Sequence, residues 1–255
     1  MRGLEDKVAI ITGAAGGIGK ALCMRFLEEG VQVIATDVNR EGLDQLAEDL
    51  TPVGGKLETQ VLDITDLDAV TKCVEHAVKM FGSLDILINN AGWDVAMPFV
   101  DTEPELWNQI VNINLMGPLN MHKAVLPVMM QQGQGKIVNI ASDAARVGSS
   151  GESVYAACKG GIVSFSKTLA REQARSGVLI NVVCPGPTDT PLLQSFVGEG
   201  EFGQKIYDGL KRAIPLKRLG EPDDIPGIVA FLSSSDADFI TGQVISVSGG
   251  LTMHG

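Results

Sequence analysis

Tyr155 and Lys159, in the stretch SVYAACKGG, are the two residues whose types and spacing most directly suggest chemistry. Residues four positions apart lie on the same face of a helix, so the two side chains come within reach of each other. A tyrosine hydroxyl beside an ammonium group suits proton transfer to or from a substrate oxygen. Taken alone, however, such a short motif is more often a partly buried aromatic residue beside a solvated cation.

The glycine-rich turn TGAAGGIG, Thr12 to Gly19, is a second pattern with chemical meaning. It follows an apolar run that predicts a buried strand and precedes a run that predicts a helix. Glycines allow a tight turn and a close approach to a pyrophosphate, while the helix N-terminus supplies N–H donors. A plain tight turn is the alternative interpretation. The residues predicted to contact a dinucleotide here are Gly13, Gly16, Gly17, Ile18 and Gly19.

Two carboxylates follow the next two predicted strands. Asp37 comes eighteen residues after Gly19, where a carboxylate hydrogen-bonds the adenosine ribose of NAD and repels the 2′-phosphate of NADP. The glycine turn contains no Arg or Lys, so the sequence predicts NAD as the cofactor. Asp63, followed by Ile64, is placed to accept a hydrogen bond from the adenine amino group. A helix-capping role for Asp63 is the alternative.

These residues must be positioned by the elements between them. Short apolar runs alternate with longer helical stretches along the chain, which predicts parallel strands joined by crossover helices. The expected strands lie within 7–13, 31–37, 56–64, 84–92, 135–142, 178–186 and 242–250. The expected helices cover 16–30, 40–50, 66–82, about 103–132, 153–176 and 222–234.

This pattern predicts an α/β fold: one domain, residues 1–255, with a doubly wound, mostly parallel seven-stranded sheet and helices on both faces. The stretch 187–215 is less regular and follows the carboxyl end of a strand. Ligands bind at that edge of such sheets, so we expect this stretch to be a substrate loop or lid.

The composition of the chain argues against some classes of binding partner. Lys and Arg total 20 against 31 Asp and Glu, a net charge of −11, which disfavours nucleic acids and strongly acidic proteins. No run is apolar enough for a signal peptide or a membrane span, so we expect a soluble, cytoplasmic protein. We expect no metal site, because the cysteines lack zinc-binding spacing and read as free thiols. They are Cys23, Cys73, Cys158 and Cys184.

Several motifs occur together in a specific order. After the glycine turn come NNAG at 89–92, NINLMG with Asn114, NIAS with Ser142, YAACK at 155–159 and PGPTDT at 185–190. Over essentially all 255 residues the chain resembles the short-chain dehydrogenase/reductase family, in its single-domain Rossmann-fold branch. The joint occurrence of these motifs reverses the odds for the opening pair, which we now expect to be catalytic.

The resemblance implies roles for individual residues. Tyr155 is the expected acid/base. Lys159 and the positive charge of an oxidised nicotinamide would lower the Tyr155 pKa from its ordinary value of about 10. Lys159 would also bond the nicotinamide ribose. Ser142 would stabilise the substrate oxygen, and Asn114, which fits better than its neighbour Asn112, would hold a water in a proton relay. Further cofactor contacts are implied for Asn90, Ala91, Gly92, Pro185, Gly186, Thr188 and Thr190.

Family membership implies alcohol–ketone interconversion without naming the substrate. The stretches 142–172, 182–190 and 239–255 resemble the family's dehydrogenases of β-hydroxyacyl-CoA thioesters such as 2-hydroxycyclohexanecarboxyl-CoA, and oxidation of such a thioester is the leading hypothesis. A 3-oxoacyl-[acyl-carrier-protein] reductase is disfavoured by Asp37 and by the net charge, whereas a sugar or polyol dehydrogenase stays open. A catalytically silent NAD-binding sensor is the alternative of another class. The family also implies a homotetramer.

The expected substrate-pocket residues are Trp93, Val95, Met97, Arg146, Val147, Phe196 and Phe202. The cations that could meet CoA phosphates are Arg146, Lys211, Arg212, Lys217 and Arg218. For each of these cations, a solvated surface charge is an equally good interpretation.

Overall fold

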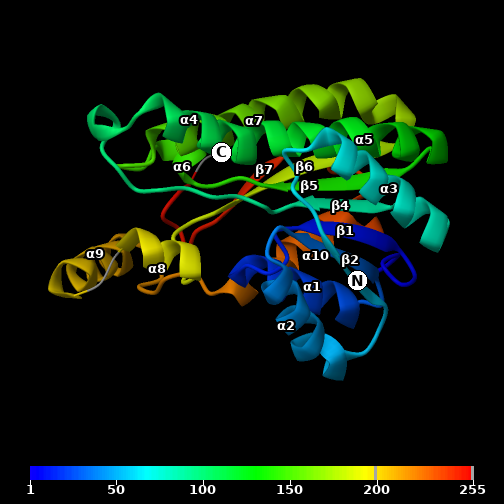
Figure 1. Ribbon diagram of the computed structural model, residues 1–255, viewed down its shortest axis with the longest axis horizontal. Helices are drawn as coiled ribbons and strands as arrows, with labels where there is room; N and C mark the ends of the chain where they lie inside the picture. Colours follow the sequence, from blue (N-terminus) through cyan, green and yellow to red (C-terminus); the bar gives the residue numbers. More distant parts are fainter. Residues whose placement is uncertain (198–199, 254–255) are drawn as a thin grey trace.

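The computed structural model describes residues 1–197 and 200–253, and for residues 195–197 and 200–203 only the backbone. Within this part of the chain, seven parallel strands form one sheet in the order β3-β2-β1-β4-β5-β6-β7 (Figure 1). The strands are β1 (Val8–Thr12), β2 (Gln32–Asp37), β3 (Leu57–Val61), β4 (Ile86–Asn89), β5 (Gly135–Ile140), β6 (Val178–Pro185) and β7 (Val244–Val247). The predicted fold is confirmed, with a sheet that is parallel throughout these strands rather than mostly parallel.

The strand order reverses between β1 and β4. The chain adds β2 and β3 on one side of β1, then crosses to β4 and continues outward on the other side. In doubly wound sheets this reversal leaves a crevice at the carboxyl ends of the strands, where ligands bind. The predicted site motifs follow those same strand ends, so the topology alone gathers them at one edge.

Two layers of helices cover the sheet, which explains why the inner strands are apolar on both faces. All five residues of β1 are buried: Ala9 and Ile11 face one helical layer, whereas Val8 and Ile10 face the other. Figure 1 shows the two layers on opposite sides of the sheet.

One layer contains α1 (Gly17–Glu28), α2 (Arg40–Leu50) and α10 (Pro226–Ser233), whose buried side chains include Phe26, Leu46 and Val229. The other contains α3 (Leu67–Phe81), α5 (Gly117–Gln132) and α7 (Ser153–Gln173), with Val74, Met121 and Leu169 buried. α4 (Pro104–Val111) packs against α7, and the short α6 (Ala144–Val147) precedes α7. Among the described residues, no helix is both long and apolar enough to cross a membrane.

The long helical region predicted near 103–132 is interrupted. Between α4 and α5 the backbone forms a π-helical turn, Asn112–Met116, which contains the buried Asn114. Such turns often occur at functional sites because they divert backbone groups from the helical hydrogen-bond ladder. Helical periodicity in the sequence does not reveal this change of pitch.

The expectation that 187–215 is irregular is wrong. The segment forms two helices, α8 (Pro191–Val197) and α9 (Gly200–Ala213), which stand away from the sheet at one end of the molecule (Figure 1). Glycines at 198, 200, 203 and 209 hide the helical spacing in the sequence, because glycine is a poor helix former. Helices on short connections can still cover the site, so a lid role for this segment stays a prediction.

Candidate active site

The glycine turn after β1 has a geometry that requires glycine at two positions. Gly13 has a φ of 65°, and a Cβ atom on it would lie 2.7 Å from the Cα of Ala91. A Cβ atom on Gly19 would lie 2.0 Å from the carbonyl oxygen of Gly13. α1 begins directly afterwards at Gly17, and Gly16 gives its N-terminus no side-chain cap. The first-turn N–H groups of α1 are therefore suited to bind a phosphate.

The segment after β4 is tied to the glycine turn. The side-chain amide of Asn90 donates to the carbonyl oxygens of Thr12 and Gly13, both at 3.0 Å. The hydroxyl of Thr12 accepts hydrogen bonds from the N–H groups of Asn90 (3.0 Å) and Ala91 (3.1 Å). The side chain of Asn90 therefore holds two loops together, and it is their backbone that would line a cofactor.

Asp37 ends β2 beside the same turn. One carboxylate oxygen accepts the N–H of Ala15 at 3.1 Å and the other accepts the N–H of Asn39 at 3.0 Å. Each oxygen retains a lone pair for another donor. The Asp37 carboxylate thus lies against the glycine turn, where the adenosine ribose is expected.

Asp63 forms a local turn: one of its oxygens accepts the N–H and the hydroxyl of Thr65, both at 2.8 Å. It does not cap α3, because Asp66 accepts the N–H groups at that helix start. Ile64 is buried against Gly117, where a Cβ atom would lie 2.4 Å from the Ile64 Cδ1. The adenine contacts expected of Asp63 and Ile64 stay predictions.

The segment after β6 approaches the glycine turn from the other side. Thr188 forms a parallel bridge with Gly220. Thr190 places its methyl carbon 3.2 Å from the Cβ position of Gly17. Gly186 lies so close to Ser248 that a Cβ atom on it would be 2.7 Å from that side chain. These contacts hold the PGPTDT stretch, beginning at Pro185, against the predicted cofactor cleft.

Tyr155 and Lys159 share one face of α7, as their spacing predicts. The Lys159 Nζ lies 5.5 Å from the centroid of the Tyr155 ring. Lys159 is only 3% exposed, and its Nζ donates to the carbonyl oxygen of Ile140 at 3.1 Å. Burial lowers the pKa of Lys159 to about 8. Ser142, just after β5, lies near enough to the Tyr155 hydroxyl to lower its pKa, so three of the four predicted catalytic residues meet.

The charges around Tyr155 differ from the expectation. Burial raises the pKa of the Tyr155 hydroxyl well above its ordinary value, and the carboxyl groups of Glu152 and Asp94 raise it further. The Ser142 hydroxyl acts in the opposite direction. The chain's own groups therefore favour neutral tyrosine, and the presence of Lys159 does not reverse this.

Asn114 completes the predicted set from the π-helical turn. Its amide nitrogen donates to the carbonyl oxygens of Trp93 (2.6 Å) and Ile110 (2.9 Å), and its Oδ1 accepts the N–H of Trp93 (3.2 Å). A Cβ atom on the neighbouring Gly92 would lie 3.0 Å from Asn114 Oδ1 and 3.3 Å from Lys159 Nζ. Asn114 therefore fixes the 92–94 backbone beside Lys159, while its water-holding role stays a prediction.

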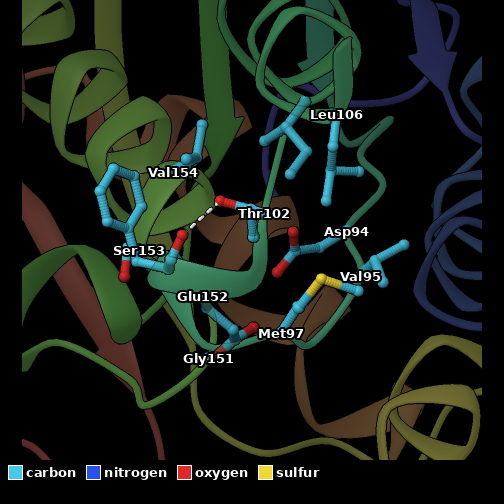
Figure 2. Close-up of a pocket in the computed structure, with 11 residues that line it drawn as sticks. Asp94, Val95, Met97, Thr102, Leu106, Gly151, Glu152, Ser153 and Val154 are labelled. Atoms are coloured by element: carbon cyan, nitrogen blue, oxygen red, sulfur yellow. Dashed lines mark hydrogen bonds between the residues drawn. The ribbon is translucent and has the colours of Figure 1, made fainter. Parts of the chain in front are cut away.

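A small pocket opens beside these residues (Figure 2). Its lining consists of Asp94, Val95, Met97, Phe99, Thr102, Leu106, Ile110, Gly151, Glu152, Ser153 and Val154. Of the predicted pocket residues, Val95 and Met97 line it, whereas Trp93, Arg146 and Val147 do not. The side chains of Phe196 and Phe202 lie outside the described residues. The sequence does not single out Asp94 or Glu152 as pocket residues, although Asp94 stands between the predicted Trp93 and Val95.

Several of the cations predicted to bind CoA phosphates interact with other groups of the protein. The Arg146 guanidinium turns toward β7 and donates to the hydroxyl of Ser246 at 2.9 Å. Arg218 forms an ion pair with Asp224, with a 2.7 Å hydrogen bond. Lys211 lies over the ring of Tyr207, with its Nζ 4.6 Å from the centroid. For Arg146 and Arg218, these bonds argue against free CoA-binding cations.

Comparison with known proteins identifies relatives along nearly the whole chain. A family model described as "Enoyl-(Acyl carrier protein) reductase" matches residues 13–252. The 3-oxoacyl-[acyl-carrier-protein] reductase FabG of Thermotoga maritima is 38% identical over 98% of this chain and 99% of its own. Subunit BbsD of (2S)-[(R)-hydroxy(phenyl)methyl]succinyl-CoA dehydrogenase from Thauera aromatica is 36% identical over 98% of both chains.

Solved structures give the same result. Actinorhodin polyketide ketoreductase with NADPH superposes with a TM-score of 0.92 at 32% identity, covering all of both chains. NAD⁺-bound xylitol dehydrogenase superposes with a TM-score of 0.88 at 30% identity, covering 98% of this chain and 100% of the other. Both cofactors thus occur in closely similar structures, so the fold alone does not choose between them.

Proposed function

The chain belongs to the short-chain dehydrogenase/reductase family, and from this premise we propose that it uses NAD to oxidise a β-hydroxyacyl-CoA thioester such as 2-hydroxycyclohexanecarboxyl-CoA. Membership makes it an oxidoreductase acting on hydroxyl and keto groups. The observation that carries the proposed cofactor and direction is the Asp37 carboxylate against the glycine turn. A negative charge there repels the additional phosphate of NADP, and NAD suits a catabolic oxidation.

The substrate class draws support from relatives of similar identity. BbsD is part of a dehydrogenase of an aromatic hydroxyacyl-CoA, and the acetoacetyl-CoA reductase of an Acinetobacter strain is also 36% identical over 98% of this chain. Both names describe a CoA thioester with an oxygen function on the acyl group. The apolar lining of the pocket by Val95, Met97 and Leu106 suits the ring or chain of such an acyl group.

The residues present fit a dinucleotide. The Cβ positions of Gly13 and Gly19 are filled by backbone, the N-terminus of α1 has no side-chain cap, and Asp37 flanks the turn. When bound, NAD would accept the hydride and bring a positive charge on its oxidised ring. The glycine turn and α1 would hold the pyrophosphate, and Lys159 would bond the ribose.

In the proposed reaction Tyr155 takes the proton of the substrate hydroxyl as the carbinol carbon loses its hydride. Ser142 donates a hydrogen bond to the same oxygen and stabilises the charge that develops on it. The ammonium group of Lys159 and the positive charge of the oxidised cofactor would together stabilise tyrosinate, against burial and the carboxyl groups that raise the pKa of Tyr155. Asn114 positions the backbone that separates Lys159 from the pocket.

A 3-oxoacyl-[acyl-carrier-protein] reductase is a second candidate, favoured by the 38% identity to the Thermotoga maritima enzyme. The net charge of −11 opposes docking of a strongly acidic carrier protein, and Asp37 opposes NADP. A polyol dehydrogenase is a third, because the xylitol enzyme was solved with NAD⁺. A silent NAD-binding sensor would bind NADH without turning over any of these substrates.

The test is a substrate panel, each member assayed with NAD and with NADP by absorbance of the reduced cofactor. The panel contains 2-hydroxycyclohexanecarboxyl-CoA, a linear 3-hydroxyacyl-CoA, a free hydroxy acid and a sugar alcohol, plus acetoacetyl-carrier protein in the reductive direction. Highest turnover of the alicyclic thioester with NAD supports the proposal. Turnover of the carrier-protein substrate with NADPH alone, or of unesterified alcohols alone, contradicts it.

The family expectation of a cytoplasmic homotetramer belongs to this proposal. Light scattering coupled to gel filtration measures the mass directly. A particle four times the mass of one 26.9 kDa chain agrees with the expectation, and a monomer contradicts it.

A further inference from the structure

Asp94 has a carboxyl group for which the described structure provides no hydrogen-bond partner. It lies two residues after Gly92 in the segment that follows β4. Both of its carboxyl oxygens are buried, and neither has a hydrogen-bond partner of good geometry among the described residues. The N–H of the next residue, Val95, lowers the pKa of Asp94, but burial outweighs this effect. A buried polar group without a partner costs free energy, so it calls for a functional explanation.

The surroundings of Asp94 form a pocket rather than a packed core. Figure 2 shows its side chain pointing into the pocket, between the side chains of Thr102, Leu106 and Met97. Thr102 is already engaged: its hydroxyl donates to the carbonyl of Phe99 at 2.7 Å and accepts the indole N–H of Trp107 at 2.6 Å. The protein thus leaves the hydrogen-bonding capacity of Asp94 to a ligand.

The pocket also holds a second carboxyl group, that of Glu152, and the charges of both act on Tyr155. Lys159, the cation on this face of α7, donates instead to the carbonyl of Ile140. Burial, and the charge of Glu152, raise the pKa of Asp94 to about 7, and burial raises that of Glu152. At pH 7 Asp94 therefore holds its proton in about half of the molecules, and in most of them at lower pH.

The titratable groups that face Asp94 are Glu152 before α7, and Tyr155 and Cys158 on α7. The other elements around the pocket present uncharged side chains: Leu106 and Ile110 from α4, Thr102 and Phe99 from the turn before it. No described cation in the lining of the pocket balances the two carboxyl groups. An anionic ligand would meet repulsion there, whereas a neutral hydrogen-bond acceptor would not.

We propose that Asp94 determines specificity by donating the proton of its carboxyl group in a hydrogen bond to the carbonyl oxygen of the substrate's acyl group. This inference rests on the proposed function. In a β-hydroxyacyl thioester that carbonyl is separated from the reacting carbon by one atom. Asp94 lies near enough to Tyr155 for its charge to raise the Tyr155 pKa, so we expect the carbonyl to meet Asp94 while the hydroxyl meets Tyr155. A thioester is neutral and accepts the bond; the corresponding free acid carries a charge that the Asp94–Glu152 pair repels.

The experiment compares kcat/KM for three alcohols in wild-type enzyme, Asp94→Asn and Asp94→Leu. The alcohols are the N-acetylcysteamine thioester of 2-hydroxycyclohexanecarboxylate, its free acid, and cyclohexanol. The short thioester removes any contribution of CoA binding, and cyclohexanol lacks the carbonyl. Asp101→Asn, an exposed carboxyl on the neighbouring turn, is the matched control.

We expect Asp94→Leu to lower kcat/KM for the thioester by about tenfold or more, with little change for cyclohexanol, because one hydrogen bond is lost. Asp94→Asn keeps a donor, so it should retain thioester activity within a few-fold while accepting the free acid better. For wild type, thioester kcat/KM should fall above about pH 7 as Asp94 loses its proton, and in Asp94→Asn this fall should disappear. Asp101→Asn should behave as wild type.

Equal losses on the thioester and cyclohexanol in Asp94→Leu would overturn the inference, since the effect would then be structural. A pH profile of Asp94→Asn that matches the wild-type profile would also overturn the inference. This comparison still tests the inference if Asp94→Leu is misfolded and fails to bind NADH. A wild-type enzyme that oxidises polyols but no thioester would overturn the proposed function and this inference together. Thioester turnover that is unchanged by substitution of Asp94 would overturn this inference and leave the proposed function standing.

Discussion

The hydroxyl of Tyr155 lies among groups that oppose its ionisation. Burial, Glu152 and Asp94 raise the pKa of Tyr155, and the Ser142 hydroxyl counters them only in part. A tyrosine held neutral suits proton donation in the direction of ketone reduction. For oxidation, it must become a base, which requires additional positive charge close to its oxygen.

Tyr155→Phe removes the hydroxyl while keeping the ring that packs beside Lys159. We expect turnover to fall by about a thousandfold or more, since general acid/base catalysis contributes on the order of 10²–10⁴ and the Ser142 contact is lost as well. NADH affinity, measured by fluorescence titration, should stay within a few-fold of wild type. Retained turnover would remove Tyr155 from the mechanism.

Asp37 governs cofactor choice in the proposal. Asp37→Ala removes the charge that opposes the 2′-phosphate, and it also removes the acceptor of the Ala15 N–H. We expect the ratio of kcat/KM for NAD over that for NADP to fall by about tenfold or more, mainly through improved use of NADP. Asp44→Ala on the exposed side of α2 is the control. If NADP stays unused in Asp37→Ala, another group excludes it.

At the scale of the elements, the π-helical turn between α4 and α5 positions the loop that lines the pocket. The side-chain amide of Asn114 forms hydrogen bonds with three backbone groups, two of Trp93 and one of Ile110. The turn therefore connects the helical layer to the segment after β4 through these hydrogen bonds. Movement at this connection would displace Gly92 and Asp94 together.

Asn114→Ala removes the side-chain partner of two part-buried backbone groups of Trp93 and of the buried carbonyl of Ile110. We expect the free energy of unfolding in urea to fall by about 3 kcal/mol, since each unsatisfied buried group costs about 1–3 kcal/mol and some will relax. We also expect kcat to fall, because the backbone beside Lys159 loosens. Asn112→Ala, an exposed residue in the same turn, should change neither quantity. Equal effects of both variants would show that the turn matters and the amide does not.

At the scale of the whole molecule, a buried polar network joins the central strands to the helical layer that carries Tyr155. Asn139 on β5 donates to Ser166 on α7 at 2.8 Å, and Asn89 on β4 donates to Asn139 at 2.8 Å. His122 on α5 bonds the carbonyl of Pro118 through Nδ1 at 2.7 Å, so Nδ1 carries the proton. Nε2 is then free to accept from Asn139 at 3.3 Å, which requires a neutral ring.

The neutrality of His122 makes stability depend on pH. Burial lowers the pKa of His122 to about 4, below the unfolded value near 6.5. Its contribution is complete above pH 6.5 and is lost as the pH falls toward 4, by roughly 3 kcal/mol in all. We expect His122→Gln to be less stable than wild type at pH 7, with a difference that shrinks toward pH 4. A stability difference that stays constant from pH 7 to pH 4, measured by urea unfolding at each pH, would contradict this expectation.

The amino-acid sequence alone predicts the alternating strands and helices, the parallel sheet, the glycine turn and the family motifs. These features depend on local periodicity, on glycine at positions that only glycine can occupy, and on short spacings such as that of Tyr155 and Lys159. The strand ends then gather at one edge because right-handed crossover connections leave few other arrangements. For this reason most of the proposed cofactor site could be chosen before the structure.

Other features depend on residues that meet only after folding. Arg146 turns from the pocket because Ser246, 100 residues away in the chain, accepts its hydrogen bond. The pairing of Asp94 with Glu152 and the raised pKa of Tyr155 arise because two loops far apart in sequence enclose one small pocket. Burial and charge proximity are properties of that enclosure, and no local pattern encodes them. The motifs therefore decide the class of reaction, while the tertiary structure decides the electrostatics of the pocket in which the reaction is proposed to occur.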